Sequence, residues 1–124
     1  MQRTRIVLRV LAASALALAA LPATAHHGWS DYGQGEFELT GVVESANLGG
    51  PHGRLRVRAA NGVWDVVLAP PHAIERSGLT PAAVPRGTRV TARGHRHNRA
   101  DRLEMKTERL VAGKRTFDLY PNRP

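Results

Sequence analysis

The chain has 124 residues, no cysteine and a formal net charge of +8, from 18 Lys and Arg against 10 Asp and Glu. The lack of cysteine excludes disulfides and thiolate metal sites, so that any metal ligand must supply nitrogen or oxygen. The positive charge favours contact with anionic surfaces but predicts no fold by itself.

Residues 1–25 have the pattern of a secretory signal peptide. Three arginines stand near the start, an apolar run extends from Val10 to Leu21, and small residues end the segment at Ala25. The apolar run is shorter than the roughly 20 residues that a membrane span needs. We therefore expect cleavage after Ala25 and a periplasmic or secreted protein with no membrane span, an uncleaved anchor helix being the alternative. One small domain then remains.

The segment 26–36 is polar and rich in glycine, which predicts an extended arm. From Phe37 to Glu44 apolar and polar side chains alternate, the pattern of a strand with one buried face. A loop is expected from Ser45 to Gly53.

Two further alternating runs, 54–59 and 63–68, flank Asn61-Gly62. Asn-Gly between such runs predicts a tight hairpin with a type I′ turn, in which both central residues have positive φ. The first run directs three arginines outward and its apolar residues inward.

Short helical turns are predicted after Pro70-Pro71. Residues 72–77 followed by Gly78 fit a helix of one to two turns, and 80–84 fit a second short turn. Alternation returns in 88–94 and in 102–111, and it slips near Arg109, which predicts a bulge.

The order of three strands, a short helix and two strands is that of a small OB-like β-barrel, so that the predicted fold is all-β with five strands over residues 37–120. A barrel closes its own edges, which suits a small domain without disulfides. An open β-sandwich fragment and a different small barrel are the alternatives.

Several motifs along the chain together resemble a family of small exported proteins of Gram-negative bacteria, classed as a domain of unknown function. They are the leader followed by His26-His27-Gly28-Trp29-Ser30, then Thr40-Gly41-Val42-Val43, Pro51-His52, Gly62-Val63-Trp64 and the spaced Gly87, Val90 and Gly94. In that family Asn usually precedes Pro-His, where this chain has Gly50. The resemblance implies a periplasmic or secreted protein and no established activity.

Cleavage after Ala25 would make His26 the first residue. Its α-amine and imidazole would form a bidentate nitrogen chelate, which with another imidazole gives a T-shaped set that suits Cu(II). His27 is nearest in sequence, but adjacent side chains seldom reach one ion, so His52, His72, His95 and His97 are better third ligands. The alternative is a solvated polar arm that binds no metal.

The other histidines have competing interpretations. His95 and His97 share a face of an extended chain, yet the arginines around them favour an exposed basic loop. His52 lies in the loop that borders the usual ligand face of OB-folds, or is a turn residue bonded to backbone. His72 more simply begins the short helix. The predicted metal residues are therefore His26, His27, His52, His95 and His97.

A second possible surface is the outward row of Arg54, Arg56 and Arg58, with Trp29 as an aromatic contact. Such a surface suits a small molecule, a peptide or an anionic polymer of the cell envelope. Nucleic acid is disfavoured as a partner, because few aromatic side chains are left for base stacking and because the leader predicts export from the cytoplasm.

No nucleophile motif, acid–base pair or phosphate loop is present, so we expect no enzyme. Three functions remain open: a copper-binding module, an OB-like envelope binding module and, last, a small enzyme with one copper ion.

Overall fold

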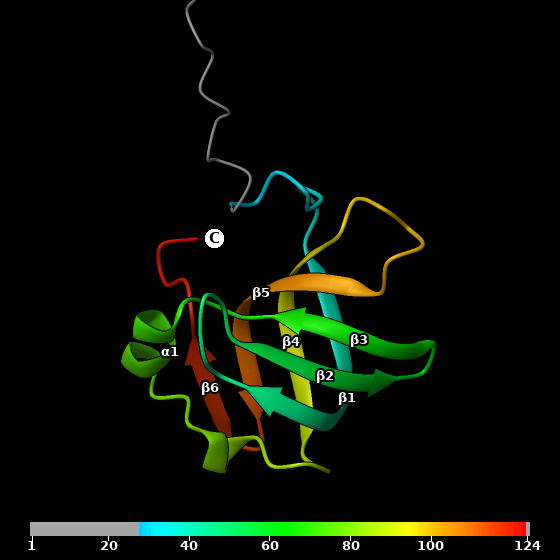
Figure 1. Cartoon of the computed structure of the whole chain (residues 1–124). Coiled ribbons are helices and arrows are strands. Elements are labelled where there is room, and N and C mark those ends of the chain that lie inside the picture. The colour runs from blue at the N-terminus through cyan, green and yellow to red at the C-terminus, as the bar shows by residue number, and fades with distance from the viewer. Residues whose placement is uncertain (1–27, 124) are drawn as a thin grey trace, which may run out of the picture.

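A computed structural model describes residues 28–123, and it has the predicted five-stranded OB-like barrel (Figure 1). The barrel consists of β1 (Phe37–Asn47), β2 (Arg54–Ala59), β3 (Gly62–Val67), β4 (Arg89–Arg96) and β5 (Glu104–Ala112). The strands follow the order β3-β2-β1-β4-β5 with antiparallel neighbours, and a parallel pairing of β3 with β5 closes the ring.

A sixth strand, β6 (Arg115–Asp118), lies outside the ring and was not predicted. It pairs with the C-terminal half of β5, whereas β3 pairs with the N-terminal half, at Glu104–Lys106. β5 is therefore shared between the barrel and a short outer hairpin.

The core follows from the alternation of the strands. The inward residues of all five barrel strands form one cluster, and the helix and the C-terminal segment add to it. Its largest fully buried side chains are those of Trp64, Phe117, Leu55, Leu68, Met105, Leu110 and Leu119. Burial of such side chains stabilises the fold by about 1.5–3 kcal/mol each relative to exposure.

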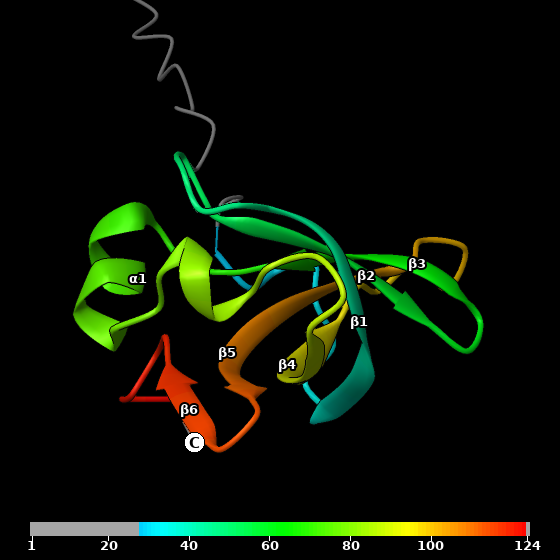
Figure 2. The same cartoon turned by 90° about the horizontal axis from the view of Figure 1, so that it is seen from below.

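The predicted helix is confirmed as α1 (Pro71–Ser77), which ends at Gly78 with a left-handed φ of 85°. Ala73 and Ile74 of α1 pack into the core, and the helix lies beside β6 in both views (Figures 1 and 2). The second predicted turn is the 3-10 helix η2 (Pro81–Ala83).

Two local predictions were wrong. β1 continues to Asn47 instead of ending at Glu44, because residues 45–47 pair with the start of β2. The hairpin forms, but Ala59 pairs with Gly62, so that its two-residue loop is 60–61 and not the predicted Asn61-Gly62. Asn61 does not have the positive φ of a type I′ turn, and its side chain accepts a hydrogen bond of 2.8 Å from the Trp64 indole.

The predicted bulge near Arg109 is confirmed. Arg93 pairs with Arg109 and Gly94 with Thr107, so that Glu108 is the additional residue on β5. At this point the two backbones approach closely: a Cβ on Gly94 would lie 2.0 Å from the carbonyl oxygen of Lys106. Only glycine fits there.

The arm, residues 28–36, folds back onto the barrel. Tyr32 forms a β-bridge with His97. The backbone amide of Gly33 donates to the carbonyl of Arg96 (2.8 Å), and the backbone amide of Asn98 donates to the carbonyl of Asp31 (2.8 Å). The arm therefore covers the outer face of β4 and β5. The predicted signal peptide, His26 and His27 lie outside the described residues. Within 28–123, no helix is long and apolar enough to cross a membrane.

Candidate functional site

Three charged side chains alternate along the outer face of β5 and are nevertheless buried: Glu104, Lys106 and Glu108 are 7%, 4% and 3% exposed. The outer face of a barrel strand normally contacts water. Here the arm and the C-terminal segment 119–123 cover it, which makes this row of charges part of a second, polar interior.

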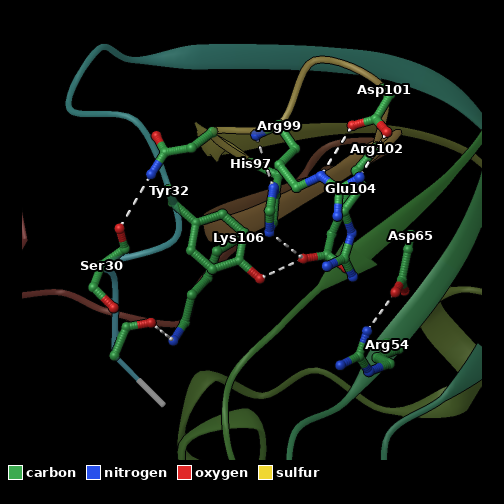
Figure 3. A network of polar contacts seen from close by, with 12 residues as sticks. Ser30, Tyr32, Arg54, Asp65, His97, Arg99, Asp101, Arg102, Glu104 and Lys106 are labelled. Atoms are coloured by element: carbon green, nitrogen blue, oxygen red, sulfur yellow. Dashed lines mark hydrogen bonds and ion pairs between the residues drawn. The ribbon is translucent and has the colours of Figure 1, made fainter. Parts of the chain in front are cut away.

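Glu104 is held by groups from several parts of the chain (Figure 3). The hydroxyl of Tyr32 donates to its Oε2 (2.8 Å), Arg102 forms an ion pair with its Oε1 (2.9 Å), and Nε2 of His97 lies 3.9 Å from Oε2. Burial and the hydrogen bond to Glu104 raise the pKa of Tyr32 above its usual range, so the phenol stays protonated and remains the donor.

Lys106 links the arm to the same row. Its Nζ donates to the carbonyl of Gly28 (3.0 Å) and lies 4.7 Å from the ring centre of Trp29. Burial, and then the positive charge of Arg123, lower the pKa of this amine. The start of the described chain is thus fixed beside β5.

A small polar pocket of about 220 Å³ opens beside these residues. It brings together His52 from the loop between β1 and β2, His97 at the end of β4, and Gly28 of the arm. Its other lining residues are Asp31, Tyr32, Arg54, Val67, Arg102, Glu104 and Lys106. The pocket therefore unites two of the predicted metal residues with one residue of the predicted arginine row.

The hydrogen bonds of His97 define its ring. Nδ1 accepts the backbone N–H of Arg99 (3.0 Å), so a neutral ring carries its proton on Nε2, the atom that faces Glu104. In this arrangement His97 offers no free lone pair, and binding a metal would require the hydrogen bond to Arg99 to break.

His95 lies apart from the small pocket and is bonded at both nitrogens. Nδ1 lies 3.0 Å from the carbonyl oxygen of Gly35, and Nε2 lies 2.8 Å from Oε1 of Glu108. Both ring nitrogens are thus occupied by oxygen atoms of the chain. His95 thus holds the arm onto β5, and it does not share a pocket with His97.

Trp29 is packed instead of projecting as an open stacking surface. The guanidinium of Arg123 lies 3.9 Å from its ring centre, and the rings of Tyr120 and His95 meet it edge-on at 5.1 and 5.5 Å. Trp29 also lines a groove of about 630 Å³ together with Ser30, Tyr32, Gly33, Gln34, Glu36, His95, Glu108 and Arg123. Of the predicted arginine row, none lines this groove.

The arginine row is exposed as predicted, but it is partly neutralised. Arg54 forms an ion pair with Asp65, and Arg58 forms one with Glu44. Of the three, only Arg56 makes no ion pair within residues 28–123. The net charge of this surface is therefore lower than its sequence indicates.

The sequence analysis did not predict three features of this region: the buried acids of β5, the hydrogen bond from Tyr32 to Glu104, and the contacts of Arg123 with Glu108 and Trp29. Acidic side chains at alternate positions of a strand are normally exposed, so only knowledge of the docked arm could have predicted their burial. Within the described residues, no cluster of three or more His, Asp or Glu is arranged to hold a metal ion.

Fold and site together define a small OB-like barrel whose outer face is covered by an N-terminal arm and which carries a polar pocket at the edge of that arm. The chain matches the model of the family of unknown function DUF6152 over residues 13–106, more than half of its length, and so belongs to that family. A comparison with curated proteins gives no match.

Proposed function

We propose that the protein is an exported binding protein, periplasmic or secreted, that holds Cu(II) through the α-amine and imidazole of His26 after cleavage at Ala25, and that it is not an enzyme. The observation that supports this proposal is that Gly28 and His52 line the same small pocket. His26 precedes Gly28 by two residues, and two extended residues span at most about 7 Å.

The donor set suits the metal. An amine and two imidazoles are nitrogen ligands, for which copper has the highest affinity among the common divalent ions. His52 is the third ligand that we favour, because it lines the same pocket as Gly28, the described residue nearest to His26 in sequence. His27 is a further donor in the same segment.

The charges of the pocket are compatible with a cation. Arg54, Arg102 and Lys106 line it, but Arg54 is paired with Asp65, Arg102 with Glu104, and Asp31 is also present.

The experiment begins with protein processed by its own host, because a tag or a leftover Met before His26 would convert the amine into an amide. Mass spectrometry first establishes the mature N-terminus. Copper is then titrated into this protein and into His26→Ala, His52→Ala and His72→Ala. We expect affinity to fall at least about 100-fold for His26→Ala, about tenfold for His52→Ala, and not at all for His72→Ala, which lies outside the pocket.

Two results would contradict the copper site. One is a mature terminus at another residue, and the other is copper binding that His26→Ala leaves unchanged.

The second candidate is an OB-like module that binds an anionic polymer of the envelope, a peptide or a small molecule. It is favoured by the presence of Arg54, Arg102, Lys106 and His52 in one pocket. A heparin fragment is a suitable polyanion probe. Arg54→Gln should weaken its binding and Arg86→Gln, in an exposed loop away from the pocket, should not; this pattern without copper uptake would support the second function over the first.

A further inference from the structure

A separate cleft lies between α1 and the C-terminal segment. Its volume is about 370 Å³, within the range of small-molecule sites. The lining residues are Pro70, His72, Ala73, Arg76, Leu119, Tyr120, Pro121, Asn122 and Arg123. None of these nine residues is acidic.

The cleft has an apolar wall and a basic rim. Pro70, Ala73, Leu119 and Pro121 supply the apolar surface, and Ala73 and Leu119 belong to the core, so that this wall is rigid. Arg76 and Arg123 supply two permanent positive charges. This division predicts a ligand with a short apolar body and a negative group.

His72 and Arg76 are four residues apart on α1 and therefore share one face of the helix. Arg76 makes no ion pair with any residue in 28–123, so its charge is not compensated within the described chain. An anion between α1 and the C-terminal segment would neutralise it.

Arg123 is already oriented on the opposite side of the cleft. Its Nε forms an ion pair with Glu108 (3.1 Å), and its guanidinium is stacked on Trp29. The terminal nitrogens of this guanidinium make no hydrogen bond within the described chain, so they remain for a ligand. A fixed guanidinium loses little conformational entropy when it binds a carboxylate.

Tyr120 adds a neutral donor. Its hydroxyl makes no hydrogen bond to residues 28–123, and burial raises its pKa, which keeps the phenol protonated. Guanidinium groups and a phenol are the donors that bind carboxylates in proteins.

We propose that the cleft between α1 and residues 119–123 binds an organic anion with a carboxylate and a short apolar chain, the carboxylate between Arg76 and Arg123 and the chain on Pro70, Leu119 and Pro121. The site is distinct from the pocket of His52, and its occupancy does not require copper.

Calorimetric titration of the metal-free mature protein with hexanoate tests the proposal, with hexanol and hexylamine as matched neutral and cationic probes. We expect hexanoate to bind and the other two to bind at least tenfold more weakly. Arg76→Gln should lower the affinity for hexanoate about tenfold, the effect of one charge-assisted hydrogen bond. Arg86→Gln removes an exposed arginine outside the cleft and should leave the affinity unchanged.

Other outcomes would overturn the proposal. Equal affinities for hexanoate and hexanol would mean that the cleft is only apolar, and equal losses in both arginine variants would mean attraction by net charge alone. Absence of hexanoate binding would also overturn it. Arg76 is exposed, so we expect the Arg76→Gln variant to fold normally. Circular dichroism of the variant will show whether a loss of binding comes from a loss of folding.

Discussion

The hydroxyl of Tyr32 and the carboxylate of Glu104 are joined by a hydrogen bond of 2.8 Å although the two residues are 72 positions apart. Tyr32 belongs to the arm and Glu104 begins β5, so this contact fixes the arm across the barrel. It also satisfies a carboxylate that is almost fully buried. The contacts that dock the arm are therefore the same contacts that bury the charged side chains on the outer face of β5.

Tyr32→Phe should lower the free energy of unfolding by about 1.5–3 kcal/mol at neutral pH, because it leaves a buried carboxylate without one of its donors. Urea denaturation measures the change. Tyr120→Phe is the matched control: its hydroxyl has no hydrogen-bond partner in 28–123, so its effect should stay below about 0.5 kcal/mol. Equal effects of the two variants would show that the Tyr32 contact contributes nothing specific.

The same contact predicts how stability depends on alkaline pH. The pKa of Tyr32 is raised in the folded protein, so above the ordinary tyrosine value of about 10 the unfolded chain loses this proton while the folded chain keeps it. Stability must therefore fall as pH rises above about 10. Lys106 acts in the opposite sense, since its folded pKa is lowered.

Denaturation between pH 8 and 11 isolates the contribution of Tyr32 to this decline. Wild type should lose stability faster than Tyr32→Phe over this interval, and the two curves should approach each other. Parallel curves would contradict a raised pKa for Tyr32 as the cause.

Glu108→Gln removes the negative charge that faces both His95 and Arg123. Loss of this charge weakens the hydrogen bonds that a buried carboxylate makes with His95 and Arg123, and we expect the free energy of unfolding to fall by about 1.5–3 kcal/mol. Glu38→Gln breaks the exposed pair with Arg93 (2.9 Å) and should cost less than about 1 kcal/mol. Thermal unfolding of both variants provides the comparison, and a smaller loss for Glu108→Gln than for Glu38→Gln would refute the argument.

Gly94→Ala should lower the free energy of unfolding by about 3 kcal/mol, because the added methyl group would meet the backbone of Lys106, which cannot move aside without breaking the pairing of β4 and β5. Gly35→Ala is the control, since nothing lies within 4 Å of a Cβ at that position. Chemical denaturation of the two variants is the measurement. A small effect at Gly94 would mean that the bulge can relax.

The barrel could be predicted because the patterns that indicate its strands and helix each lie within a short segment of the chain. Alternation in residues 54–59 and the glycine after 72–77 indicate a strand and a helix end without knowledge of the rest of the chain. β6 escaped prediction because its four residues contain one buried side chain, Phe117, which is too short a pattern to recognise. The exact turn was missed because Asn61 bonds the Trp64 indole, a contact that depends on the packed core.

The candidate site was predictable only in part. The sequence singled out His52 and His97, which share a pocket, but it could not show that Arg99 occupies one nitrogen of His97 or that Gly35 and Glu108 occupy His95. The contact with Gly35 forms only when the arm docks, that with Glu108 depends on the pairing of β4 with β5, and that with Arg99 depends on the local turn after β4. The contacts of Trp29 with Tyr120 and Arg123 join segments about 90 positions apart.

Closure of the ring by β3 and β5 also bears on self-association. Every barrel strand is paired on both sides, so within residues 28–123 the outer side of β6 is the principal run of strand backbone left to recruit another chain. Four residues, with Arg115 at one end and Asp118 at the other, make a poor template for intermolecular strand addition. The described chain therefore offers little strand backbone for intermolecular β-sheet formation.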